Sequence, residues 1–100
     1  LTALSLTGNI LQGTIPTTLG QCINLEFLGL DSNALTGTIP TELGLLTNLE
    51  SIILTNNGIE GQIPTQVCSL PYLSRLDVDR CQDIFDRDCV EQPNNSCPQS

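Results

Sequence analysis

Side chains that could carry out catalysis are scarce in this sequence. The chain has no His and no Lys, so a Ser, Thr or Cys nucleophile would lack a basic partner. Carboxylate pairs alone can perform acid–base chemistry, but the acidic residues of the first three quarters are spread along a regular scaffold rather than gathered in a pocket. We therefore predict that the protein is not an enzyme and that it uses no cofactor.

Metal binding is the second chemistry to consider. A run of acidic residues near the C-terminus could in principle hold calcium; its members are Asp77, Asp79, Asp83, Asp86 and Asp88. The run lacks the Gly and the terminal Glu of an EF-hand loop, and three arginines are interleaved with it. Zinc would need a different ligand set, but there is no His and no C-x-x-C pair. We predict a salt-bridged, solvated terminus and no metal site.

The elements that position these residues follow from an internal repeat of 24 residues. Leu4, Leu28, Ile52 and Leu76 share one column of this repeat, and Asn9, Asn33 and Asn57 share another. Further columns hold Leu, Gly, Ile and Pro. The repeat divides the chain into three full units and a partial one, followed by a different segment: 1–24, 25–48, 49–72, 73–80 and 81–100.

Each column has a physical meaning. The order L-x-x-L-x-L predicts a strand with one buried face, and stacked copies predict a parallel sheet. A buried Asn after the strand can satisfy backbone groups in a turn. Gly13 and its equivalents suit a tight or positive-φ backbone, Ile-Pro predicts an extended segment, and T-x-L-G-x-L predicts a short helical or 3-10 turn. No unit can bury its own apolar face, so stability must come from stacking.

This pattern resembles the plant-type leucine-rich repeat, and the segment Leu35-Thr36-Gly37-Thr38-Ile39-Pro40 has its typical form. The resemblance covers residues 1 to about 81. It implies an α/β solenoid that is curved, with a parallel sheet on the concave face and short helical turns on the convex side. Members include receptor-kinase ectodomains, receptor-like proteins, secreted inhibitors and algal cell-surface proteins, whose concave sheets usually contact ligands.

The segment 81–100 is predicted to be a cysteine-containing cap. Cys68, Cys81, Cys89 and Cys97 cluster at the end of the repeats, which favours disulfides and an oxidising compartment. These four cysteines allow three pairings. Coil geometry gives a weak preference for Cys68–Cys89 with Cys81–Cys97, since Cys68 and Cys81 are half a coil apart. Cys22 lies in a Leu column, which favours a free, buried thiol.

A sequon in the C-terminal tail, Asn94-Asn95-Ser96, predicts N-glycosylation at Asn94. Together with the disulfides, it favours an extracellular or cell-surface location. The chain has no Met and begins inside the repeat pattern, so we expect it to be a piece of a longer protein with further repeats before Leu1.

The candidate binding site comes from the solvent-facing positions of the predicted concave sheet. Most of these positions hold small or polar residues, but Phe27 and Ile53 are apolar and diagonal across neighbouring strands, with Gly29 leaving a gap between them. An apolar pair with a polar rim predicts a small binding patch. The predicted ligand-binding residues are Phe27, Ile53, Asp31, Thr55, Arg75 and Asp77.

We therefore predict non-catalytic recognition of an extracellular protein, peptide or cell-wall polysaccharide. The net charge of −8, with no basic residue in 1–72, argues against nucleic acid and anionic membrane surfaces as partners. No apolar run is long enough to span a membrane, so we expect no direct membrane insertion by this segment. Two alternatives stay open. One is a structural spacer within a larger cell-surface protein. The other is ice binding by stacked threonines, with Thr14 above Thr38 and with a second column of Thr17, Thr41 and Thr65.

Overall fold

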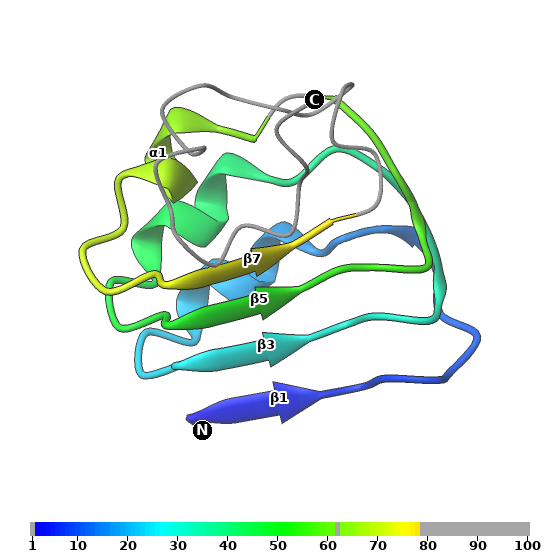
Figure 1. Ribbon diagram of the computed structural model, residues 1–100, viewed down its shortest axis with the longest axis horizontal. Coiled ribbons are helices and arrows are strands. Elements are labelled where there is room, and N and C mark those ends of the chain that lie inside the picture. The colour runs from blue at the N-terminus through cyan, green and yellow to red at the C-terminus, as the bar shows by residue number, and fades with distance from the viewer. Residues whose placement is uncertain (1, 62, 79–100) are drawn as a thin grey trace.

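The computed structural model of the chain describes residues 2–61 and 63–78. Three coils of solenoid and the first strand of a fourth are stacked (Figure 1). The strands that begin each coil are β1 (Ala3–Ser5), β3 (Phe27–Gly29), β5 (Ser51–Ile53) and β7 (Arg75–Asp77). They form a four-stranded parallel sheet in the order β1-β3-β5-β7. The predicted leucine-rich-repeat solenoid is therefore confirmed.

The register of this sheet follows the sequence repeat. Leu4 pairs with Leu28, Leu28 with Ile52, and Ile52 with Leu76, so each strand stacks on the residue one repeat away. Alternation along each strand sends these Leu and Ile side chains inward, where Leu28, Ile52 and Leu76 are fully buried. The solvent-facing side of this sheet is called the concave face below.

After its concave strand, each of the three coils adds one strand to a second sheet. It consists of β2 (Gln12–Thr14), β4 (Ala34–Gly37) and β6 (Gly58–Ile59), paired in parallel in the order β2-β4-β6. Here partners lie 22 residues apart, so Thr14 is opposite Thr36 and Thr36 is opposite Gly58. The predicted stacking of Thr14 on Thr38 is therefore wrong, because these strands are staggered by two residues relative to the repeat.

Short helical turns cover the side of the core opposite the concave sheet (Figure 1). They are the 3-10 helices η1 (Thr17–Gln21) and η2 (Thr41–Leu45) and the α-helix α1 (Thr65–Cys68). Each begins after the Pro of the Ile-Pro pair, whose backbone is extended. Thr17, Thr41 and Thr65 are the exposed first residues of these three turns, so they form no strand ladder.

The core is built from stacked aliphatic side chains between the concave sheet and the helical turns. Its buried members include Leu30, Leu35, Leu43 and Leu54, which are at most 2% exposed. The equivalent positions of the first repeat are more open: Leu4, Leu6 and Leu19 are only partly buried, and Leu11 is exposed. Stacking against both neighbours is what buries each coil, and β1 has a neighbour on one side among the described residues.

The Asn column satisfies backbone groups in the turns, as predicted, and its side chains also join consecutive coils. Asn33 and Asn57 are half-buried and Asn9 is exposed, whereas buried side chains were predicted. Asn33 Nδ2 donates to the carbonyl oxygens of Leu30 at 2.9 Å and, in the preceding coil, of Leu6 at 3.1 Å. Its Oδ1 accepts a bond from the backbone N–H of Leu11 at 3.2 Å. The Gly column also behaves as predicted: Gly13, Gly37 and Gly61 have φ values of 85°, 81° and 87°.

Candidate functional site

The predicted site residues all come from the concave strands or from the residues just after them. Phe27 and Ile53 lie on β3 and β5, and Arg75 and Asp77 lie on β7. Asp31 and Thr55 follow β3 and β5 at equivalent positions. The fold therefore places all six on one face across three neighbouring strands, because residues two apart on a strand point to the same side of a sheet.

The apolar centre of this face is formed by Phe27 and Ile53. Gly29 is paired in register with Ile53 and with Ser5, so Phe27 and Ile53 are diagonal neighbours. The predicted gap at Gly29 is absent, because the ring of Phe27 fills it. A Cβ atom on Gly29 would lie 2.9 Å from Phe27 Cε2 and 3.6 Å from Ser5 Oγ. Phe27 and Ile53 are consequently only half-exposed, and Gly29 is buried.

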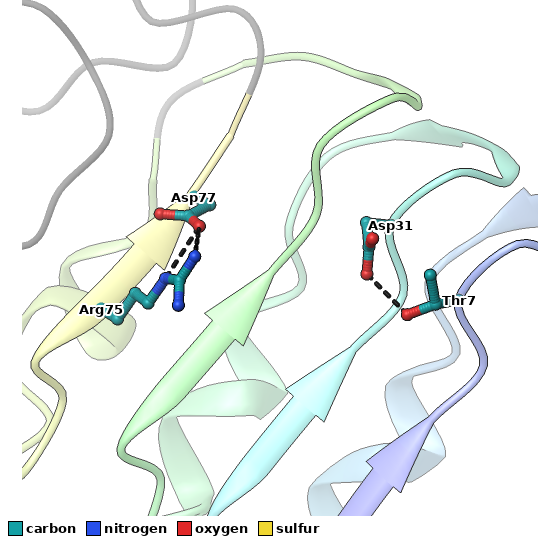
Figure 2. Close-up of polar contacts among 4 residues, drawn as sticks. All are labelled: Thr7, Asp31, Arg75 and Asp77. Carbon is teal, nitrogen blue, oxygen red and sulfur yellow. Dashed lines mark hydrogen bonds and ion pairs between the residues drawn. The ribbon is translucent and has the colours of Figure 1, made fainter.

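One side of the apolar centre is bordered by Asp31. Its Oδ1 accepts a hydrogen bond from Thr7 Oγ1 at 2.7 Å, across two consecutive repeats (Figure 2). Thr7 also lies 3.4 Å from Ser5 through their side-chain oxygens. The bond fixes the Asp31 carboxylate beside the first repeat, and an ionised carboxylate keeps acceptor capacity for a ligand donor.

The other side is bordered by an ion pair within β7. Asp77 Oδ2 accepts from Arg75 Nε at 2.9 Å and lies 2.8 Å from Arg75 Nη2 (Figure 2). The Arg75 side chain is 57% exposed and that of Asp77 is 13% exposed. Asp77 therefore holds the guanidinium in place, while the remaining N–H donors of Arg75 face solvent. Arg75 is also the only basic residue in positions 1–78.

Thr55 is half-buried two residues after β5, and its backbone oxygen accepts a bond from the N–H of Ser32 at 2.9 Å. It lies in the same column as Asp31 and therefore also borders the apolar centre. Its side chain has no contact with another predicted site residue. Asp31 follows β3 and Asp77 lies on β7, so β5 separates them, and each has its own partner. The structure thus brings together two polar pairs around an apolar centre, and not a single polar cluster.

Thr7 is the residue that the sequence prediction omitted. It occupies the same column as Asp31, one repeat earlier, so in-register stacking could have identified it as the partner of Asp31. The Arg75–Asp77 pair could similarly have been read from alternation along one strand.

Several predictions fall wholly or partly outside the described residues. They are the disulfide pairing, which needs Cys81, Cys89 and Cys97, the glycosylation of Asn94, and most of the acidic run. Cys22 is a free thiol that is partly buried against the core. Within residues 2–61 and 63–78, no group of three or more potential ligands could hold a metal ion. No helix in that part of the chain has the length and apolar character to cross a bilayer.

Comparison with solved structures places the fold among plant receptors. The ectodomain of the Arabidopsis thaliana membrane receptor kinase GASSHO1/SCHENGEN3, in complex with CASPARIAN STRIP INTEGRITY FACTOR 2, is 36% identical, with a TM-score of 0.74. The Arabidopsis receptor kinase HAESA, with the peptide hormone IDA and a co-receptor, is 31% identical, with a TM-score of 0.71. A plant ice-binding protein is 32% identical, with a TM-score of 0.70.

These matches cover 78%, 80% and 77% of this chain but only 9%, 15% and 27% of the respective structures. The chain therefore spans a minor part of each of them. No curated protein sequence matches it. The family model for the Leucine Rich Repeat matches residues 1–22, 24–46 and 48–70, which together make up more than half of the chain. The chain belongs to the leucine-rich-repeat family, and its structural relatives include the ectodomains of plant receptor kinases.

Proposed function

We propose that the protein is a non-catalytic recognition module that binds an extracellular protein or peptide on its concave face. The observation that carries this proposal is the apolar centre of Phe27 and Ile53, bordered on β7 by an oriented arginine with unused donors. Aromatic and arginine side chains often dominate the binding energy of protein interfaces, and here Phe27 and Arg75 lie in one register row with β5 between them.

The arrangement suits a ligand with an apolar side chain and a nearby carboxylate or carbonyl oxygen. The apolar side chain would cover Phe27 and Ile53, and the oxygen would accept from Arg75. Because Asp77 already holds the guanidinium, less side-chain entropy is lost when the ligand binds. Asp31 would favour a donor or a positive group at the other end of the ligand. The ligand would therefore bind in one orientation across the sheet, from β3 to β7.

The solved relatives support this class of ligand and an extracellular location. HAESA is described in complex with a peptide hormone, and other relatives include a plant peptide hormone receptor in complex with RGF2. A cell-wall polysaccharide is a less favoured ligand, because the concave face offers one half-exposed aromatic ring for stacking on sugars among the described residues.

The test is a binding screen of the purified chain against synthetic secreted-type peptides, with dissociation constants measured for those that bind. We expect Phe27→Ala and Arg75→Ala each to weaken binding on the order of tenfold or more, since loss of an interface anchor typically costs more than about 1 kcal/mol. The matched control is Thr18→Ala, an exposed position of η1 on the opposite side of the core. Peptides that lose affinity with Thr18→Ala but not with the two concave variants would contradict the proposal.

Ice binding is a second candidate, favoured by the similarity to a plant ice-binding protein. Because Thr14 does not stack on Thr38, ice binding would depend on the exposed column of Thr17, Thr41 and Thr65. Thermal hysteresis that disappears in Thr41→Leu would support it. A spacer role is the third candidate, and absence of both peptide binding and thermal hysteresis would favour it.

A further inference from the structure

The Asn column of the repeat contains one member with a distinct chemical neighbour. Asn9 is followed by Ile10 and Asn33 by Ala34, whereas Asn57 is followed by Gly58. A glycine leaves the backbone nitrogen after the asparagine unshielded by any side chain and allows that peptide unit its widest range of conformations. Asn57 is therefore the column member whose side-chain amide is most open to attack by the following backbone nitrogen.

That attack is a balanced reaction that needs only water. The Gly58 nitrogen bonds to Asn57 Cγ and loses its proton, the Cγ–Nδ2 bond breaks, and ammonia leaves from a cyclic succinimide. Water then opens either carbonyl of the ring. One opening gives Asp at position 57 and the other gives isoaspartate, in which the backbone passes through the side-chain carbon.

The fold opposes this reaction by holding the Asn57 amide from both sides. Nδ2 lies 2.9 Å from the carbonyl oxygen of Leu30 in the preceding coil, 3.1 Å from that of Leu54 and 3.2 Å from that of Thr55. Oδ1 accepts a bond from the N–H of Leu35 at 3.0 Å. The amide cannot rotate toward the Gly58 nitrogen, nor can ammonia leave, until these contacts open, and those to Leu30 and Leu35 join the second and third repeats.

We propose that Asn57 is a site of spontaneous deamidation in this fold and that opening of the contact between the second and third repeats sets its rate. The product also changes the concave face. An Asp or isoaspartate at position 57 turns a donor into an ionised acceptor that faces the carbonyl oxygens of Leu30, Leu54 and Thr55, so the bond to the preceding coil is lost. Ile53 and Thr55 of the candidate site belong to the segment that this bond holds.

The preceding repeat supplies a matched control. Asn33 has the same pattern of contacts, to Leu6, Leu30 and Asp31 through Nδ2 and to Leu11 through Oδ1. The two side chains share these contacts, and they differ in the residue that follows, which is Ala34 after Asn33 and Gly58 after Asn57. Gly58 does not have a positive φ, and a Cβ atom there would lie 3.3 Å from the Leu35 backbone oxygen, which is a close approach without severe overlap. Gly58→Ala therefore copies the Asn33-Ala34 sequence, and Ala34→Gly copies the Asn57-Gly58 sequence.

The experiment incubates the whole chain in mildly alkaline buffer, folded and in urea. Peptide mass spectrometry then measures the mass gain of deamidation at each asparagine, with isoaspartate identified by chromatography. We expect Asn57 to convert ahead of Asn9 and Asn33, at a rate at least about tenfold slower in the folded chain than in urea, because several hydrogen bonds must open first. Gly58→Ala should lose most of the Asn57 product, and Ala34→Gly should make Asn33 a second site. Asn57→Asp, made directly, should melt at a lower temperature than the wild type.

Equal rates at Asn33 and Asn57 in the folded wild type would overturn the role of Gly58. Equal rates for Asn57 in the folded and unfolded chain would overturn control by the repeat contact. Absence of product from the folded chain after the unfolded chain has fully converted would overturn the modification itself.

Discussion

The ring of Phe27 lies on the backbone of Gly29, two residues further along the same strand. A Cβ atom on Gly29 would lie 2.9 Å from Phe27 Cε2 and 3.1 Å from Cζ, the far end of the ring. On the concave face, the outer end of the aromatic ring therefore lies over Gly29, which pairs in register with Ile53. Because Phe27 is half-exposed and is not part of the buried core, we expect displacement of its ring to change the shape of the candidate site more than the stability of the fold.

The first prediction follows from that expectation. Gly29→Ala should displace the Phe27 ring but lower the free energy of unfolding by less than about 1 kcal/mol, since only a flexible ring end must move. Urea unfolding measures the stability, and NMR contacts between the Phe27 ring and residue 29 measure the displacement. A loss above about 3 kcal/mol, or an unmoved ring, would show that this packing is understood wrongly.

The second prediction concerns the stacked core. Leu30→Ala and Leu54→Ala should each cost about 2–5 kcal/mol of unfolding free energy, because both side chains are buried between neighbouring coils. Leu6→Ala, at the equivalent position of the first repeat, should cost less, because Leu6 is only partly buried. Denaturant unfolding of the three variants gives the comparison, and a larger loss at Leu6 would contradict the proposed stacking.

The third prediction distinguishes backbone strain from steric overlap in the Gly column. Gly13→Ala should cost about 1–2 kcal/mol, because its φ is positive and nothing lies within 4 Å of the new Cβ. Gly37→Ala should cost more, because its Cβ would also lie 2.9 Å from Thr14 Cγ2. Adding Thr14→Ser, which removes that methyl group, should recover the difference. If Gly13→Ala and Gly37→Ala lose equal stability, the overlap is not energetically significant.

The fourth prediction concerns the first strand. Hydrogen exchange of the 100-residue chain should be faster at the backbone amides of residues 2–8 than at those of residues 50–56. Within the described part of the chain, β1 pairs on one side, with β3, whereas β5 pairs on both sides. Exchange followed by mass spectrometry resolves the two segments. Equal protection in a monomer of verified mass would contradict this expectation.

The fifth prediction concerns the redox state of the five cysteines. We expect Cys68, Cys81, Cys89 and Cys97 to be oxidised and Cys22 to remain reduced. Alkylation of the unfolded but unreduced protein should therefore label one cysteine, and peptide mapping should place the label on Cys22. Four or five labels would remove the argument for disulfides and for an oxidising compartment.

Most of the fold could be predicted because each coil repeats the same local solution. The columns of Leu28 and Ile52 fixed the concave register, and the columns of Asn33 and Gly37 fixed the turns, since each residue type has few structural uses there. Local chemistry and long-range stacking agree at these positions, so a single sequence was sufficient.

The features that escaped prediction depend on neighbouring side chains rather than on the repeat. The Phe27 ring could have extended toward solvent, and the distances to Gly29 show that it instead lies over that residue. The bond from Thr7 to Asp31 needed the exact strand register. The pairing of Thr14 with Thr36 needed the stagger of the second sheet, which the spacing of 24 residues conceals.

That stagger has a consequence for the shape of a longer array. Partners lie 24 residues apart in the concave sheet but 22 apart in the second sheet, so on that side each coil slides by two residues, or roughly 6–7 Å, relative to its neighbour. Because each coil is displaced along the second sheet but not along the concave sheet, it is rotated relative to its neighbour about the axis on which the coils stack. Coils added with the same register would wind into a superhelix, and an elongated ligand that follows the concave residues would have to wind with it.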